Sequence, residues 1–61
     1  MNRNKLEKVY KLNIYQVVEG SDEWPLVETI TAKTSDDCIA QAEMEYDTDQ
    51  YSWSNPFETY E

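Results

Sequence analysis

A single helix start signal constrains the fold of this sequence more than any other feature. Thr34 is followed three residues later by Asp37, which matches the pairing of a helix-capping hydroxyl with a first-turn acid. Asp36 adds another carboxylate to the first turn, where the helix dipole favours anions. The segments on either side are rich in β-branched and aromatic residues, which favour strands. The sequence therefore predicts one helix embedded among strands.

The helix predicted after Thr34 has a narrow apolar face and a broad polar one. On a helical wheel, one side collects Ser35, Ile39, Ala42 and Tyr46. This stripe is flanked by Cys38 and Glu43, and the opposite side presents Asp37, Ala40, Gln41 and Met44. We therefore expect the helix to bury the stripe against a sheet and to expose its acids to water.

Two strands are predicted before the helix. Residues 9–18 alternate between apolar and polar positions, and residues 24–32 form the second strand after a glycine-containing turn. Pro25 cannot donate a ladder hydrogen bond, so it belongs at the start of the second strand or on an edge. In that strand Glu28 shares a face with the apolar Ile30. We expect a bulge or a partly exposed edge to resolve this conflict.

A third strand is predicted after the helix. Residues 51–57 alternate aromatic and polar side chains, and Pro56 is expected to end this strand or to confine it to an edge. The predicted fold class is α+β: a small antiparallel three-stranded sheet with one helix packed on it, in the order β-β-α-β. Residues 1–61 form a single small domain, and we expect frayed ends at residues 1–7 and 58–61.

The residue types present argue against catalysis. The chain has no histidine, so the commonest general base is missing, and a core built from 61 residues leaves little room for a substrate cleft. The one cysteine, Cys38, has no partner for an internal disulfide. Asp36 and Asp37 beside it favour the neutral thiol, so we interpret this cysteine as structural. We therefore expect no enzymatic activity and no cofactor.

One spacing resembles a metal-binding loop. Asp47, Asp49 and Glu58 fall at the first, third and twelfth positions of an EF-hand-like loop. However, Ser52 stands where that loop needs a glycine, and Tyr51 stands where it needs an oxygen ligand. We interpret the spacing as coincidence and expect no bound metal.

The charge is strongly negative and unevenly distributed along the chain. The net charge is −8, but residues 1–18 hold four basic residues and one acid, whereas residues 19–61 hold twelve acids and one lysine. This distribution argues against direct nucleic-acid binding, because phosphates need clustered Lys and Arg side chains. No apolar stretch suggests a membrane span or a signal peptide, so we expect a soluble cytoplasmic protein. The acids fit a partner protein with a basic surface, or they serve solubility alone.

The candidate partner-binding residues come from the helix and from the segment that follows it. The carboxylates that would meet cationic groups of a partner are Asp36, Asp37, Glu43, Glu45, Asp47 and Asp49. Met44, on the outer helix face, and Trp53 would supply apolar anchors, as would Tyr15, which lies opposite the core face of its strand. Instead of binding a partner, these apolar residues could be buried in the core or could be isolated exposed residues.

The segment from Ile30 to Tyr46 resembles the strand, cap and helix of a family of small inhibitors of bacterial RNA polymerase from T-odd coliphages. The matching positions are Ile30, Ala32, Thr34, Asp36, Ala42, Glu43 and Tyr46, with Asp37 standing for an acid. This resemblance implies a β-β-α-β fold and the occupation of a basic, DNA-handling surface of the polymerase. The third strand of the family carries an Arg-x-Arg pair that grips the polymerase, and this chain has Asn55 and Phe57 there.

The residues and the resemblance together leave three hypotheses for function. The preferred one is a phage-type protein that inhibits or modulates a nucleic-acid-handling protein of the bacterial host, RNA polymerase above all. The second is a DNA mimic that blocks a restriction or CRISPR nuclease, which requires carboxylates at duplex phosphate spacing. The third is a structural or accessory subunit of a larger assembly, in which the acids serve only solubility.

Overall fold

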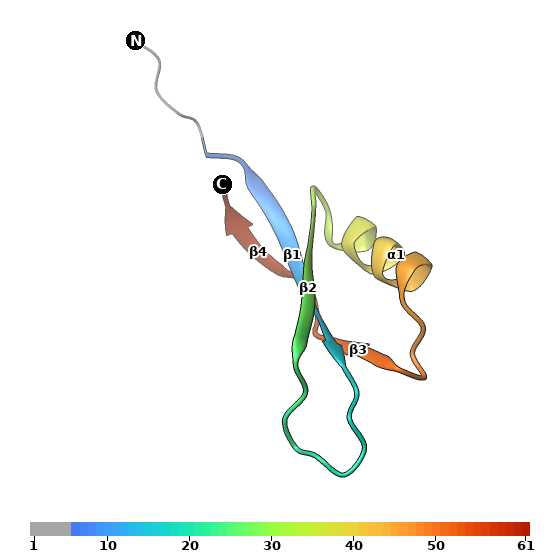
Figure 1. Ribbon diagram of the computed structural model, residues 1–61. Coiled ribbons are helices and arrows are strands. Elements are labelled where there is room, and N and C mark those ends of the chain that lie inside the picture. The colour runs from blue at the N-terminus through green and yellow to red at the C-terminus, as the bar shows by residue number, and fades with distance from the viewer. Residues whose placement is uncertain (1–5) are drawn as a thin grey trace.

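The protein is an open antiparallel sheet with a single helix on one of its faces (Figure 1). The computed structural model describes residues 6–61. The elements follow one another as β1 (Lys8–Gln16), β2 (Leu26–Ala32), α1 (Ser35–Glu45), β3 (Tyr51–Trp53) and β4 (Phe57–Tyr60). The α+β class and the predicted order β-β-α-β are therefore confirmed, with the last strand divided into β3 and β4.

Strand β1 is the centre of the sheet because every other strand pairs with it. Along one edge it pairs with β2, where Leu12 lies opposite Ile30. Along its other edge it pairs with β3 near its C-terminal end and with β4 near its N-terminal end. All three pairings are antiparallel. The register of β1 therefore decides which side chains each of the other strands presents to either face.

The third strand is interrupted, and the expectation of three strands is corrected to four. Pro56 lies in the break between β3 and β4, where its missing N–H leaves no ladder hydrogen bond to lose. Pairing with β1 resumes at Phe57 and continues to Tyr60, so residues 58–61 are not the frayed tail that we expected. Beyond the strands, the backbones of Glu7 and Glu61 donate N–H groups to each other's carbonyl oxygens at 2.8 and 3.0 Å. Fraying was also expected at residues 1–7. Glu7 is held by these hydrogen bonds, and residues 1–5 lie outside the described residues.

A bulge in β2 resolves the conflict that the sequence posed. Ile14 lies opposite Glu28 but Tyr15 lies opposite Leu26, so Val27 is an extra residue on β2. Simple alternation would place Leu26 on the face of Glu28 and Ile30. The extra residue instead moves Leu26 to the opposite face, beside Tyr15. The expected second strand begins later than predicted, at Leu26, and the first ends earlier, at Gln16.

Helix α1 begins where the capping pattern predicted. Thr34 has extended backbone angles, and its side-chain oxygen accepts a hydrogen bond from the N–H of Asp37 at 3.1 Å. Asp36 and Asp37 occupy the first turn. The helix ends at Glu45, and the N–H of Tyr46 still donates to the carbonyl oxygen of Ala42 at 2.9 Å. Two of the acids in this part of the chain therefore have a local role in starting the helix.

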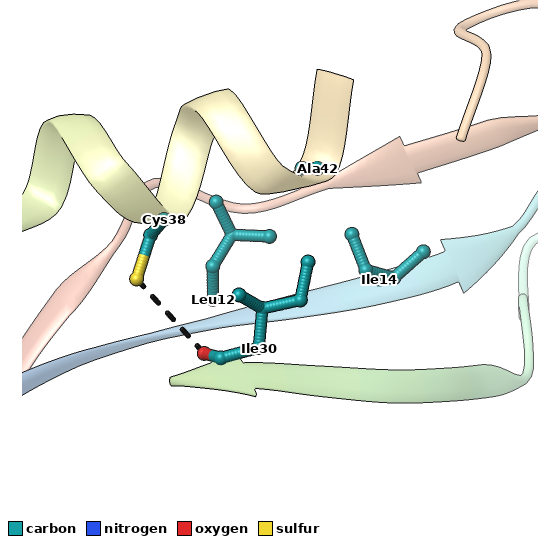
Figure 2. Packing of buried hydrophobic residues seen from close by; sticks show 5 residues of the cluster. All are labelled: Leu12, Ile14, Ile30, Cys38 and Ala42. Atoms are coloured by element: carbon teal, nitrogen blue, oxygen red, sulfur yellow. Dashed lines mark hydrogen bonds between the residues drawn. The ribbon is translucent and has the colours of Figure 1, made fainter. Parts of the chain in front are cut away.

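The core lies between α1 and the β1–β2 half of the sheet. Its fully or almost fully buried residues are Leu12, Ile14, Ile30, Cys38 and Ala42 (Figure 2). Cys38 was expected to flank the apolar stripe of the helix and instead lies at its centre. Because Cys38 and Ala42 are small, the helix backbone can approach the sheet closely, and the larger side chains of β1 and β2 fill the layer between them. The Cys38 thiol donates a hydrogen bond to the carbonyl oxygen of Tyr10 at 3.1 Å.

Within residues 6–61, α1 is not long and apolar enough to cross a membrane.

Substitution of the capping residue tests this account of the helix start. Thr34→Ala removes the acceptor for the N–H of Asp37, so we expect the free energy of unfolding to fall by about 1 kcal/mol. Urea unfolding followed by circular dichroism measures the change. The matched control is Thr48→Ala in the exposed turn after α1, which should stay within about 0.5 kcal/mol of the wild type. Equal stabilities of the two variants would contradict the capping role.

Candidate functional site

The alternation of β1 divides the sheet into two faces of different character. Leu12 and Ile14 point toward α1, and their cross-strand partners lie on the same face. This face, which we call the helix face, includes the two acids within the strands: Glu28, opposite Ile14, and Glu58, opposite Tyr10. Every acid within the strands therefore shares the side of the sheet on which α1 packs.

The other side of the sheet carries no covering layer within residues 6–61, and we call it the open face. Its strand residues, assigned from the cross-strand register, are Val9, Lys11, Asn13, Tyr15, Leu26, Thr29, Thr31, Ser52, Phe57 and Thr59. None of these residues is acidic. Carboxylates reach this face only at its margin, beyond the strands, where Glu61 forms an ion pair with Lys11 and Glu7 lies next to it.

The predicted carboxylates on α1 and in the turn after it are all exposed. On the helix they are Asp36, Asp37, Glu43 and Glu45, and in the turn they are Asp47 and Asp49. Within residues 6–61 the one ion pair is that between Lys11 and Glu61, on the open side of the sheet. No lysine in the part of the chain that the structure describes forms an ion pair with a carboxylate of α1. Together with Glu28 and Glu58, the carboxylates of α1 make the helix side electronegative.

One of these carboxylates has a structural role. An oxygen of Asp47 accepts hydrogen bonds from the backbone N–H groups of Asp49 at 3.1 Å and Gln50 at 3.0 Å. This side chain therefore shapes the turn that leads into β3, as aspartates commonly do. Glu43, Glu45 and Asp49 make no side-chain hydrogen bond or ion pair within residues 6–61. These carboxylates are the ones best placed to meet an external cation.

The structure separates the three apolar residues that were predicted as anchors. Met44 is 84% exposed and lies on α1 between Glu43 and Glu45. Trp53 lies opposite Ile14 on the helix face of β3, where it packs against the core and is half-buried. Tyr15 lies on the open face, away from the acids. Of the three, Met44 is the one that is both fully exposed and next to carboxylates in the sequence.

A contact between Tyr46 and Glu28 was missed by sequence reasoning. The hydroxyl of Tyr46, just past the end of α1, donates a hydrogen bond to the Glu28 carboxylate on β2. The Tyr46 ring also packs edge-on against Tyr51, with ring centroids 4.8 Å apart. The hydrogen bond to the Glu28 carboxylate raises the pKa of Tyr46 to about 12. The only sequence signal was the acid at a core-facing position of β2.

Neither a pocket nor a metal-binding cluster is present among the described residues. Residues 6–61 enclose no pocket, and no group of three or more His, Cys, Asp or Glu side chains among them is placed to hold a metal. Glu58, from the EF-hand-like spacing, belongs to β4 instead of a ligand loop. Burial raises the pKa of the Cys38 thiol, and Asp37 adds to this effect, whereas a hydrogen bond with the Ala32 backbone opposes it.

No protein-family model matches the chain, and neither the curated proteins nor the solved structures contain a match. The fold and the charge distribution define a small acidic α+β protein with one electronegative side.

The Tyr46–Glu28 contact predicts an unusual alkaline titration. The chain has five tyrosines, and Tyr46 should lose its proton near pH 12, well above the ordinary value of 10.0. Because the folded state favours the neutral phenol, the contribution of this contact to stability is complete below about pH 10 and is lost as the pH approaches 12.

Glu28→Gln removes the charge and should return the Tyr46 pKa toward its ordinary value, whereas Glu19→Gln in the hairpin should not. Titration of tyrosinate absorbance measures this, and a wild-type chain whose tyrosines all titrate together near 10 would contradict the contact.

Proposed function

We propose that this chain is a small acidic protein of phage type that binds a nucleic-acid-handling protein of a bacterial host and inhibits or modulates it. RNA polymerase is the first candidate, and the host cytoplasm is the compartment in which the two would meet. The observation that carries this proposal is the concentration of carboxylates on the helix side of the sheet.

The physical basis is charge complementarity. Proteins that handle DNA or RNA present clustered Lys and Arg side chains to phosphates, and such a surface also attracts carboxylates. Facing charge patterns raise the association rate and orient the partners, and the effect weakens as salt screens the charges. A chain with −8 net charge most of whose acids lie on the helix side would approach a basic groove with that side first.

Within this surface, α1 would make the central contact. Glu43 and Glu45 flank Met44, so the helix presents an exposed apolar side chain between two carboxylates. Interfaces commonly combine an apolar anchor with a charged rim. Asp36, at the start of α1, and Asp49, in the turn after it, would extend the charged rim beyond both ends of the helix.

The resemblance to the phage polymerase inhibitors supports the same proposal. The Ile30–Tyr46 segment forms the end of β2, the Thr34 cap and α1, which is the strand, cap and helix arrangement that the resemblance implies. At the positions of the arginine pair of that family, Asn55 lies in the break before β4 and Phe57 lies on the open face. A partner would therefore be held through the acids of α1 and not through those positions.

Affinity capture from bacterial lysate tests the proposal. The tagged chain should retain a nucleic-acid-handling protein, with a polymerase subunit expected first, at low salt and should release it at high salt. Recovery of a restriction or CRISPR nuclease would favour the DNA-mimic hypothesis. Retention of no such protein at low salt would contradict the proposal.

Variants with matched charge locate the binding side once the partner is captured. Combined Glu43→Gln, Glu45→Gln and Asp49→Asn substitutions remove three carboxylates from the helix side, and at about 0.5 kcal/mol each they should weaken binding about tenfold. The control combines Glu19→Gln, Asp22→Asn and Glu23→Gln in the hairpin between β1 and β2, which changes the net charge equally. Titration calorimetry compares the two. Equal losses would show that only net charge matters and would contradict a binding site on the helix side.

A further inference from the structure

The two edges of the sheet differ in how they are protected from further strand pairing. At one edge, β3 and β4 are separated by a break that contains Pro56, which has no N–H to offer. At the other edge, β2 runs from Leu26 to Ala32 without a proline or a lysine, the residues that commonly protect an edge strand. The bulge at Val27 lies at the start of β2. Residues 28–32 therefore form a regular edge with which no strand within residues 6–61 pairs.

The backbone groups of two threonines on β2 point to this free edge. Ser54 donates its N–H to the carbonyl oxygen of Asn13 at 3.3 Å, so the backbone groups of Asn13 point to β3 and not to β2. Asn13 lies opposite Thr29, and Lys11, two residues earlier on β1, lies opposite Thr31. The N–H and carbonyl groups of both threonines therefore point away from β1, and within residues 6–61 they form no ladder hydrogen bond.

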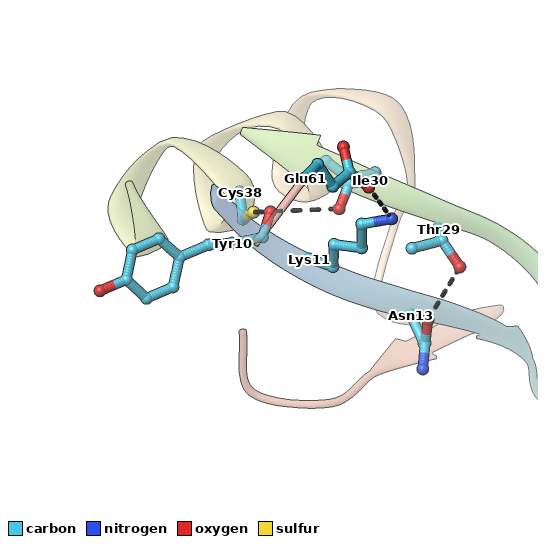
Figure 3. A network of polar contacts seen from close by, with 7 residues as sticks. All are labelled: Tyr10, Lys11, Asn13, Thr29, Ile30, Cys38 and Glu61. Carbon is cyan, nitrogen blue, oxygen red and sulfur yellow. Dashed lines mark hydrogen bonds and ion pairs between the residues drawn. The ribbon is translucent and has the colours of Figure 1, made fainter. Parts of the chain in front are cut away.

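The side chain of Thr29 already has a partner on the open face. Its hydroxyl donates a hydrogen bond to the side-chain oxygen of Asn13 at 2.8 Å (Figure 3). This hydroxyl keeps its partner when another strand is added at the edge, so the addition leaves neither polar side chain unsatisfied. What the edge offers to a partner is mainly backbone hydrogen bonding, which an extended segment can supply.

The helix-face side of the same edge is negatively charged. Glu28 accepts the hydrogen bond from Tyr46 with one carboxylate oxygen, and its other oxygen makes no hydrogen bond or ion pair within residues 6–61. The hydrogen bond to Glu28 raises the pKa of Tyr46, and the charge of Glu45 on α1 adds to this effect. The carboxylates of Glu28 and Glu45 therefore both lie near the Tyr46 hydroxyl. A strand added along β2 would place a side chain beside them.

We propose that the edge of β2 binds an extended segment of a basic partner protein as an additional antiparallel strand. The backbone of the segment pairs with Thr29 and Thr31, and its Lys or Arg side chains point to the helix face, where they meet Glu28 and Glu45. Main-chain hydrogen bonds supply affinity in this mode of recognition, and alternate side chains supply specificity. Charge selects the occupant, because a chain of −8 net charge attracts a cationic segment and repels an acidic one. The basic character of the partner rests on the proposed function, whereas the geometry of the edge does not.

A capped synthetic peptide of alternating lysine and valine tests the proposal without the partner. NMR titration to about 5 mM peptide detects even millimolar binding. Binding should shift the amide signals of Thr29 and Thr31 and slow the hydrogen exchange of both N–H groups, which should exchange rapidly in the free chain. Absence of binding, or binding without slower exchange at these two residues, would overturn the proposal.

Matched peptides separate strand addition from simple attraction between charges. The same peptide with N-methylated valines keeps its charge but loses the donors that face the threonines, so it should bind about tenfold more weakly or worse. A peptide of alternating glutamate and valine should not bind. Equal affinities of the methylated and unmethylated peptides would overturn strand addition and leave the proposed function in place. That function fails separately, when capture from lysate retains no nucleic-acid-handling protein.

Variants of the chain locate the contact. Thr31→Pro removes an N–H from the free edge and should weaken peptide binding at least about fivefold, whereas Thr31→Ala keeps the backbone donor and should stay within about twofold of the wild type. Glu28→Gln should weaken binding about twofold, and Glu58→Gln, which removes the same charge from the helix face at the opposite edge, should have a smaller effect. Circular dichroism checks folding, and the methylated peptide decides the matter on the wild type if Thr31→Pro does not fold. Unchanged binding by folded Thr31→Pro would contradict the proposal.

Discussion

The side-chain alternation of β1 is the constraint on which the rest of the structure depends. Leu12 and Ile14 face the helix, while Asn13 and Tyr15 between and after them face the other way. Because β2, β3 and β4 all pair with β1, this alternation assigns every strand residue to one of the two faces. A register slip by one residue would exchange the core with the open face and move Glu28 and Glu58 away from the acids of α1.

The helix contributes few residues to the small core, and most of its exposed polar residues are acidic. Only Cys38 and Ala42 of α1 are buried, and both are small, so the helix gives little apolar surface to the fold. Burial of a large apolar side chain contributes about 1.5–3 kcal/mol, and most of that comes from Leu12, Ile14 and Ile30 in the sheet. The outward-facing residues of α1 therefore do not pack against the core. Most of the polar side chains of the helix can be acidic without disturbing the fold. Tyr46 secures the end of the helix to β2 through Glu28.

Patterns among neighbouring residues predicted the helix cap and the order of the elements. The fourth strand and the rotation of the helix depend on contacts between residues far apart in the sequence. The Thr34 cap and the order of elements follow from neighbouring residues, and the placement of Glu28 with Ile30 indicated the irregularity that proved to be a bulge. Pro56 correctly indicated an interruption in the predicted strand, although β3 already ends at Trp53. The return of the chain to β1 as β4 depends on partners near the other end of the sequence. The position of Cys38 depends on how α1 is rotated over the sheet, which a helical wheel does not contain. The predicted acids are exposed as expected, whereas Trp53 packs against the core because β3 aligns it with Ile14.

The central claim is that the carboxylates make one side of this protein electronegative and leave the open face without acids inside its strands. Proton relaxation by a cationic and an anionic nitroxide of the same size measures the potential near each exposed proton. The account predicts much stronger relaxation by the cationic probe at Glu43, Met44 and Glu45, and nearly equal relaxation by both probes at Thr29 and Thr31. Similar preference for the cationic probe at both sets of protons would contradict it.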